Sequence, residues 1–209
     1  MLGLGANLTG GADIVPEWVT PADFGSALKL WLRHDTGLQE ADESTPEDGE
    51  DITKWTDYSG NGWHATASSN HPSYDDDGYV VFTGADENLR TGSNIVLSTF
   101  SVYVRLKYTD TTFNASDILL DDPDVNSNFW RVQSSTTIKA RASGGAARTF
   151  TLHSGTTLAG DGSAFYNMGL ERDGDGNATS YLNGTANGAS QTMPLGTDNS
   201  KPFAVDRIK

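Results

Sequence analysis

Residues 100–108 read FSVYVRLKY, the most regular alternation of apolar and polar side chains in the chain. One face takes Phe100, Val102, Val104, Leu106 and Tyr108, and the other takes Ser101, Tyr103, Arg105 and Lys107. A period of two residues is that of an extended strand, whose successive side chains point to opposite faces. The stretch therefore predicts a β-strand with one face on a core and the other face in solvent.

Shorter runs of the same kind lie before and after this stretch, and nearly every gap between them contains Gly, Asn, Asp or Pro. They predict strands at residues 28–33, 52–55, 79–82, 88–90, 118–120, 129–133, 137–141, 149–152, 165–172, 179–183 and 203–208. No window is typical of a long amphipathic helix. A dozen short strands separated by turns indicate an all-β fold, a two-sheet antiparallel β-sandwich of the jelly-roll kind.

The chain has 209 residues, which suits one medium-sized domain plus a short tail. Residues 1–25 are Gly-rich with two prolines and no periodicity, which predicts an extended N-terminal arm ahead of a sandwich of residues 26–209. Two interpretations of the arm stay open. It is an unstructured terminus, or it docks on a neighbouring molecule through Ile14, Val15 and Trp18.

The last segment, KPFAVDRIK, is typical of a strand just under way, with no closing segment after it. We expect the closing strand of the sandwich to be missing and the edge at residues 28–33 to be open. An open edge invites pairing with another chain, so a neighbouring molecule is expected to cover it if the chain stops at Lys209.

The formal net charge is −14 and no cysteine is present. A surface this acidic repels nucleic acid and anionic membranes, whose binding depends on Lys and Arg. The absence of cysteine leaves the redox compartment open. The N-terminus lacks the basic and apolar regions of a secretory signal, so we expect the chain either to be made and kept in a cytoplasm or to leave by a route other than a cleaved signal, such as lysis.

The segment WTDYSGNGW, residues 55–63, has the composition of a tight corner. Gly60, Asn61 and Gly62 permit positive φ, and short polar side chains such as Asp57 cap neighbouring amides. Trp55 and Trp63 flank the corner, and we expect them to pin it to the core.

Two turns are predicted in the segment RDGDGNATSYLNG. The residues from Asp173 to Asn177 link two strands, and Asn183-Gly184 is typical of a two-residue type I′ hairpin. Asp173, Asp175 and Asn177 also occupy alternate positions like the start of an EF-hand loop. Ala178 and Gly184 stand where that loop needs Gly and Glu, which favours the hairpin over a calcium loop.

Three motifs occur in a fixed order: LKLWLRHD with ITKWTDYSGNGWHATASSNHPSY, YVVFTGADENLRTG with STFSVYVRLKY, and MGLERDGDGNATSYLNGT. This order resembles concanavalin A-like lectin/glucanase domains of the laminin-G-like type, as found in phage and bacterial proteins. The resemblance covers residues 27–209. It implies the sandwich fold but not one function, because the family spans lectins, glycan hydrolases, adhesion modules and capsid components.

We do not expect an enzyme. Hydrolases of this fold hold their carboxylates on one strand as E-x-D-x-x-E, and the chain has no such string. No nucleophile elbow is present, and His34, His64, His71 and His153 lack the spacing of zinc ligands. The acidic residues gather in four loop segments, 40–50, 75–77, 121–124 and 173–175.

Two kinds of ligand remain open. Calcium is one, because the loop carrying Asp121, Asp122, Asp124 and Asn128 falls where pentraxin-like relatives place some calcium ligands; otherwise no cofactor is expected. A glycan is the other, since exposed aromatic rings stack on sugars; Trp31, Trp63 and Trp130 are candidates by residue type, with Asn128 for the hydroxyls. The competing interpretation places each of these tryptophans in the core.

The sequence favours a non-catalytic structural protein of a phage particle: a decoration, fibre, baseplate or neck component. Its expected location is the virion, and its expected partners are other virion proteins, further copies of itself in a homo-oligomer and a host surface glycan. The alternative is a carbohydrate-binding module of a secreted or surface bacterial protein, located outside the cell or on its surface. A glycan lyase or hydrolase ranks third.

Overall fold

The computed structural model describes residues 20–67, 69–83, 87–96, 98–113, 118–121, 129–142, 144–195 and 204–208. These residues form antiparallel sheets with one short helix, which confirms the mostly β class predicted from the sequence. The elements are η1 (Pro21–Ala27), β1 (Leu38–Gln39), β2 (Lys54–Trp55), β3 (Ala65–Thr66), β4 (Ser73–Asp75), β5 (Tyr79–Val81), β6 (Leu89–Val96), β7 (Phe100–Leu106), β8 (Ile118–Asp121), β9 (Phe129–Ser134), β10 (Thr137–Arg141), β11 (Arg148–Thr151), β12 (Tyr166–Arg172), β13 (Asn177–Leu182), β14 (Thr185–Ala186), β15 (Gln191–Thr192) and β16 (Ala204–Ile208).

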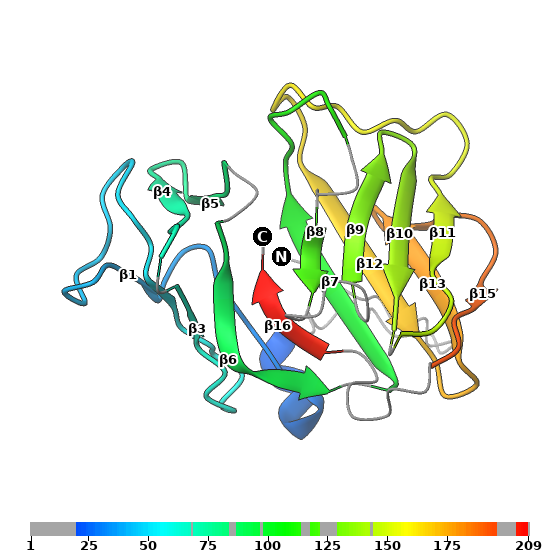
Figure 1. Ribbon diagram of the computed structural model, residues 1–209, viewed down its shortest axis with the longest axis horizontal. Coiled ribbons are helices and arrows are strands. Elements are labelled where there is room, and N and C mark those ends of the chain that lie inside the picture. Colours follow the sequence, from blue (N-terminus) through cyan, green and yellow to red (C-terminus); the bar gives the residue numbers. More distant parts are fainter. Residues whose placement is uncertain are drawn as a thin grey trace, which may run out of the picture.

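The strands form two larger sheets and one hairpin (Figure 1). The nine-stranded sheet has the order β1-β2-β3-β6-β16-β8-β9-β10-β11. The five-stranded sheet has the order β14-β13-β12-β7, with β15 paired to β13, and it lies behind β8–β11 in Figure 1. Strands β4 and β5 form the separate hairpin.

Strand β7 contains most of the alternating stretch at residues 100–108. It pairs with β12 along its whole length, from Phe100 opposite Arg172 to Leu106 opposite Tyr166. Its exposed positions are Ser101, Tyr103 and Arg105, and the intervening apolar residues are buried or half-buried. One face of the five-stranded sheet therefore meets solvent while the other packs on the core.

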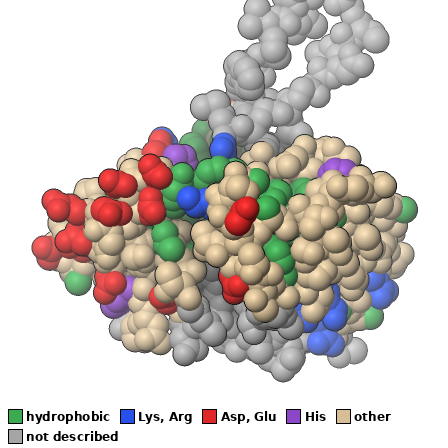
Figure 2. Space-filling model, turned by 90° about the horizontal axis from the view of Figure 1, so that it is seen from above, with side chains coloured by type: hydrophobic (Ala, Val, Ile, Leu, Met, Phe, Trp, Pro, Cys, Tyr) green, Lys and Arg blue, Asp and Glu red, His purple; other side chains and the backbone are tan. Residues whose placement is uncertain are grey.

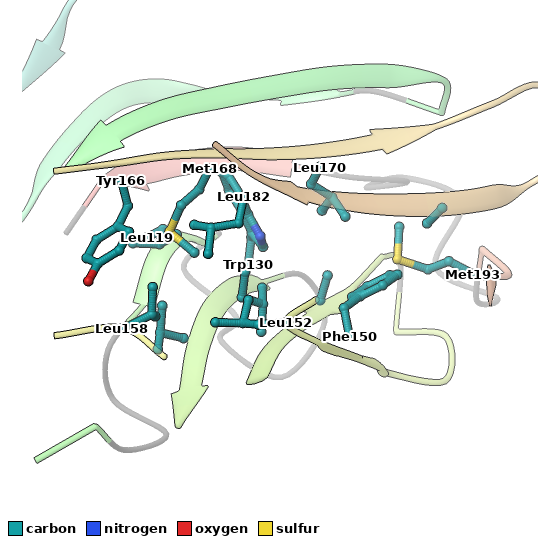
Figure 3. Close-up of a cluster of buried hydrophobic side chains, with 14 of the residues drawn as sticks. Leu119, Trp130, Phe150, Leu152, Leu158, Tyr166, Met168, Leu170, Leu182 and Met193 are labelled. Atoms are coloured by element: carbon teal, nitrogen blue, oxygen red, sulfur yellow. The ribbon is translucent and has the colours of Figure 1, made fainter. Parts of the chain in front are cut away.

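The main core takes side chains from both sheets (Figure 3). The nine-stranded sheet contributes Trp130, Ile138 and Phe150 from β9–β11, and all three are fully buried. The five-stranded sheet contributes residues such as Met168 and Leu170 of β12. We call this cluster the inter-sheet core.

A second, smaller core lies at the other end of the nine-stranded sheet. Its buried members are Leu38, Ile52, Ala65 and Leu89. Trp55 and residues of the β4–β5 hairpin pack against it while remaining partly exposed. This core, together with the short strands β1–β5 and the loops that join them, is called the clasped end.

The strand predicted at residues 28–33 does not form. Leu32 makes only an isolated bridge to Asp57, outside any strand. The neighbouring backbone groups bond elsewhere: the Trp31 amide donates to the Asp57 carboxylate, and the Asn61 side chain donates to the Leu28 carbonyl. Side-chain capping thus replaces the ladder hydrogen bonds that the alternation predicted.

Two expectations concern the ends of the chain, and one of them needs correction. The predicted extended arm ends in a 3-10 helix, η1, where Thr20 and Asp23 form a capping box, so its last residues are not extended. Residues 1–19, which include Ile14, Val15 and Trp18, lie outside the described residues. Strand β16 is paired on both sides, with β6 and with β8, so this segment lies inside the nine-stranded sheet, and the missing closing strand stays a prediction.

Candidate functional site

The predicted corner at residues 55–63 is organised around one buried carboxylate. Asp57 is 6% exposed and accepts hydrogen bonds from the amides of Trp31 (3.0 Å), Ser59 (2.8 Å) and Trp63 (3.0 Å). Its own amide donates to His64 Nδ1 at 3.1 Å. A single side chain therefore joins three segments of loop backbone, as a capping aspartate can.

The rest of the corner follows from its turn residues. Gly60 and Gly62 have φ values of 86° and 75°, a region that favours glycine. The Asn61 amide donates to Ser59 Oγ at 3.2 Å, and its side chain reaches the 28–29 backbone. Trp55 is half-buried against the smaller core and donates its indole N–H to the Arg33 carbonyl at 2.7 Å.

The ionisation of Asp57 reflects two opposed effects. Burial acts to raise the pKa of this carboxyl, because it disfavours the charged form. Hydrogen bonds from Ser59, Trp31 and Trp63 stabilise the carboxylate and outweigh burial, so the pKa of Asp57 lies below its ordinary value. The corner thus holds a charged Asp57 at neutral pH.

An aromatic and charged cluster, the Trp31 cluster, sits on this corner. Trp31 and Tyr58 meet edge to face with ring centroids 6.3 Å apart, and the Arg33 guanidinium lies 5.5 Å from each ring. Arg33 also makes a bidentate ion pair with Asp35, at 3.0 and 2.8 Å. Tyr58 is 39% exposed, and its hydroxyl lies 3.1 Å from Thr36 Oγ1. Together they present a ring face beside oriented polar groups.

A shallow hollow of about 200 Å³ lies next to this cluster, between residues 34–38, Thr45, Pro46 and Tyr74. Asp35 and Thr36 belong to both the cluster's polar groups and the hollow. A pocket of this size holds one sugar ring or less, since drug-sized sites run to roughly 300–1,000 Å³.

The structure separates the residues that were candidates for glycan binding. Trp31 is half-buried and belongs to the surface cluster just described. Trp63 is half-buried in the corner, with its backbone bound to Asp57. Trp130 is 0% exposed in the inter-sheet core, so it has no face for a sugar and is withdrawn as a ligand residue. Asn128 lies outside the described residues.

A second surface lies on the solvent face of the five-stranded sheet, and none of its residues was among the predicted site residues. Tyr103 of β7 and Tyr181 of β13 stand opposite Gly169 of β12 in one row across the sheet. Both tyrosine hydroxyls donate to the carboxylate of Glu171, that of Tyr181 at 3.1 Å. A Cβ atom on Gly169 would lie 2.7 Å from the Tyr103 ring, so that ring rests directly on the glycine backbone.

The same face continues into a patch of cations over aromatic rings. Arg105 lies 4.8 Å from the centroid of the Phe165 ring, and Lys107 Nζ lies 3.9 Å from that of Tyr79. The two rings pack with centroids 5.3 Å apart. Phe165 is 38% exposed and Tyr103 is 40% exposed. The set Tyr79, Tyr103, Arg105, Lys107, Phe165, Glu171 and Tyr181 is called the outer tyrosine face.

Burial and the nearby Glu171 carboxylate both favour the neutral form of these tyrosines. Burial, followed by the hydrogen bond to Glu171, raises the pKa of Tyr103 well above its ordinary value of 10.0. The pKa of Tyr181 is raised by burial and by the charge of Glu171. The hydroxyls therefore stay protonated as donors, and they fix the carboxylate and both rings in place.

The sequence contained part of the signal for this face. The alternation at residues 100–108 already grouped Tyr103, Arg105 and Lys107 on the solvent side. The hairpin predicted at 173–177 forms, with the Asp173 amide bound to the Asn177 carbonyl, and it sets the register of β12 and β13. The pairing of β7 with β12, which completes the row, spans distant segments, and local patterns do not encode it.

Acidic side chains gather at the end of the molecule that carries β1 and β4 (Figure 2). Asp48, Asp75 and Asp76 bring carboxylate oxygens within 4.8 Å of one another, and two of the three are exposed. Exposed loop carboxylates are ordinarily solvated, and no metal site is assigned to them. Of the two loops with calcium-like residues, 173–177 is a hairpin turn, and most of 121–128 lies outside the described residues.

In the described ranges, no helix is both long enough and apolar enough to cross a membrane. Compared with known proteins, the chain matches no family model and no curated protein sequence. The Trp31 cluster and the outer tyrosine face are therefore interpreted from their own chemistry.

Proposed function

We propose that the chain is a non-catalytic structural protein of a phage particle, a decoration, fibre, baseplate or neck component that packs against virion proteins and other copies of itself. The observation that carries the proposal is the outer tyrosine face, an exposed sheet face built for contact. It combines Tyr, Phe and Arg, the residue types enriched in protein interfaces. Its rings are held in fixed positions, so little side-chain entropy is lost when a partner binds.

The finer fold is part of this proposal. We infer a jelly-roll sandwich of the concanavalin A-like kind, as the ordered motifs suggest. Support comes from the inter-sheet core, to which strands of both larger sheets contribute side chains. Virion proteins commonly use such a sandwich as a packing block.

A contact role agrees with the hydrogen bonding of two carboxylates, Glu171 and Asp57. Glu171 accepts from two tyrosine hydroxyls, and among the outward described positions of β7, β12 and β13 it is the only acidic residue. Asp57 is buried and occupied by three amides. Both carboxylates are thus held by several donors at once, which supports a positioning role rather than proton transfer.

The test is co-purification with particles. Cells that encode the chain are brought to lysis, particles are banded on a density gradient, and an antibody raised against the chain is used on every fraction. We expect the chain to band with the particles in a fixed ratio to their major shell protein. A chain found only in the unsedimented fraction would contradict the virion assignment.

A carbohydrate-binding module is the second candidate, and the Trp31 cluster favours it. A ring face beside a fixed Arg33–Asp35 pair suits a sugar, whose apolar face stacks while its hydroxyls bond to the charged pair. A glycan array separates the candidates: specific binding that is lost in Trp31→Ala and kept in Trp63→Ala would favour the module. Reducing-end assays on the bound glycans should show no turnover, with or without added calcium.

A further inference from the structure

The cations of the outer tyrosine face have no acidic partner among the described residues. Arg105 and Lys107 take part in neither of the ion pairs found there and lie over Phe165 and Tyr79 instead. The whole chain has 28 Asp and Glu against 14 Lys and Arg. Two cations therefore lie over aromatic rings on one surface of an otherwise acidic protein. Such a surface is complementary to a partner that carries acidic and aromatic side chains.

The shape of this face suits an extended partner. Tyr103 and Arg105 occupy alternate positions of β7 and Lys107 follows directly after its end, which spaces the three over about 13 Å if the chain stays extended. Phe165 lies beside them with more than a third of its surface exposed. The result is a stripe of rings and positive charge rather than a closed pocket.

The chain itself contains a segment with complementary chemistry. Residues 13–18 read DIVPEW, which combines two acidic residues, Asp13 and Glu17, with Trp18. Pro16 fixes its own φ and favours an extended backbone in the residue before it. The segment is therefore acidic, aromatic and suited to lie along a stripe.

The described residues that directly follow this segment are mostly exposed. Helix η1 has no buried residue, and its Phe24 is 47% exposed. The 19 residues that precede Thr20 can span at most roughly 65 Å when extended, enough to reach a neighbouring molecule. This exposure favours an arm directed to another copy.

We propose that the outer tyrosine face of one copy receives the N-terminal segment Asp13–Trp18 of a second copy, with the two acids against Arg105 and Lys107 and Trp18 against the exposed rings. The contact is head to tail, so it links copies in a ring or a filament. The inference rests on the proposed function, to whose docking arm it gives a receptor.

A charge swap on the full-length protein tests the contact. The face variant carries Arg105→Glu and Lys107→Glu, and the arm variant carries Asp13→Lys and Glu17→Lys. Sedimentation velocity over a concentration series should show concentration-dependent self-association of the wild type, weakened at least tenfold in each variant alone. An equimolar mixture of the two variants should regain association, because the reversed arm then meets a reversed face of opposite charge. Added NaCl should weaken the wild-type contact by screening.

Two controls keep the result specific. Lys54→Glu with Lys139→Glu makes the same change in net charge as the face variant, away from the face, and should leave association as in the wild type. Thermal melting of each variant should match the wild type, which excludes unfolding as the cause.

The remaining outcomes overturn the inference in distinguishable ways. Loss in the arm variant with no loss in the face variant would move the receptor elsewhere, while the proposed function would stand. Another outcome is a protein that stays monomeric while its arm is protected from protease in the wild type but not in the face variant. That outcome would mean that the arm docks on the face of its own molecule. A wild type that is monomeric at every concentration and absent from particles would remove the inference and the proposed function together.

Discussion

The inter-sheet core and the clasped end hold the same kind of backbone by different means. In the inter-sheet core, β7, β12 and β13 run for six or seven residues, and side chains such as Trp130 and Leu170 are fully buried between the sheets. At the clasped end, strands β1–β5 have two or three residues each. There the backbone is joined by the side chains of Asp57, Asn61 and Trp55.

The difference predicts different sensitivities. Apolar burial is non-directional and scales with area, so the inter-sheet core should respond to loss of volume. Side-chain-to-backbone hydrogen bonds depend on one acceptor and on its charge, so the clasped end should respond to single polar atoms and to pH. Substitutions paired with matched controls separate these two responses.

The largest effect is expected from Trp130→Ala in the inter-sheet core. The side chain is 0% exposed, and its removal should lower the free energy of unfolding by about 3–5 kcal/mol. Trp31→Ala, at the clasped end, removes a half-buried ring and should cost about 1 kcal/mol. Urea unfolding followed by circular dichroism measures both. Equal losses would mean that the two regions are stabilised alike.

The same contrast explains what the sequence could and could not predict. Strands of the inter-sheet core have long alternating runs, and the predictions at 100–108, 129–133 and 137–141 match β7, β9 and β10 within a few residues. Residues 28–33 also alternate, yet Asp57 and Asn61 take the backbone groups that a ladder would use. A side chain 26 residues away is not visible to a local periodicity.

The candidate sites divide in a similar way. The capping role of Asp57 follows from local turn chemistry, and the sequence contained it. The outer tyrosine face depends on the pairing of β7 with β12, two strands distant in the sequence, which only the tertiary fold sets. The position of β16 between β6 and β8 has the same origin. Local sequence patterns therefore could not predict which distant strands pair, or in which register.

A glycine pair at the clasped end should give the next largest effect. Gly37 and Gly62 have nearly equal φ values, 78° and 75°, so alanine is strained at both. A Cβ at Gly37 would also lie 2.8 Å from Thr56 Cβ and from the Tyr58 ring, whereas nothing lies within 4 Å at Gly62. Gly37→Ala should cost about 2–4 kcal/mol, from strain and overpacking together, and Gly62→Ala about 1 kcal/mol.

Thermal melting of the two glycine variants measures the difference. Gly62→Val should be worse than Gly62→Ala, because a β-branched residue tolerates positive φ least. If Gly37→Ala were no less stable than Gly62→Ala, the Tyr58 ring and Thr56 would have moved to accommodate the added methyl group without loss of stability. The clasped end would then be less tightly packed than its hydrogen bonds suggest.

The next largest loss of stability is expected from removing the Asp57 carboxylate. Asp57→Ala leaves the amides of Trp31, Ser59 and Trp63 without their carboxylate, and partial access of water limits the loss to about 2–3 kcal/mol. Asp35→Ala breaks an exposed ion pair and should change the free energy of unfolding by less than about 1 kcal/mol. Chemical unfolding at neutral pH distinguishes the two variants.

Asp57 should also make the clasped end sensitive to acid. Its pKa is lower in the folded chain than its ordinary value near 3.8, so the unfolded chain binds the proton more readily. The stabilisation it provides is fully present above about pH 4 and is lost as the pH falls through the folded pKa. The difference in stability between the wild type and Asp57→Asn should therefore shrink below about pH 4, and a constant difference would contradict this role of the carboxylate.

The smallest effect is expected on the outer tyrosine face, where the five-stranded sheet that covers the inter-sheet core meets solvent. Tyr103→Phe keeps the ring on Gly169 and removes only the hydroxyl bound to Glu171, so at neutral pH it should cost less than about 1 kcal/mol. The effect should appear at high pH. Because the folded pKa of Tyr103 is raised, its contribution is complete below the unfolded pKa of 10.0 and is lost as the pH rises through the folded value. Ultraviolet titration of phenolate absorbance should show Tyr103 and Tyr181 ionising late; one of these late ionisations should disappear in Tyr103→Phe, and both should shift to lower pH in Glu171→Gln. If Tyr103 ionised at the ordinary pH in the intact protein, the tie between the two tyrosines and Glu171 would be absent, and the face would lack the fixed rings on which the proposed contact depends.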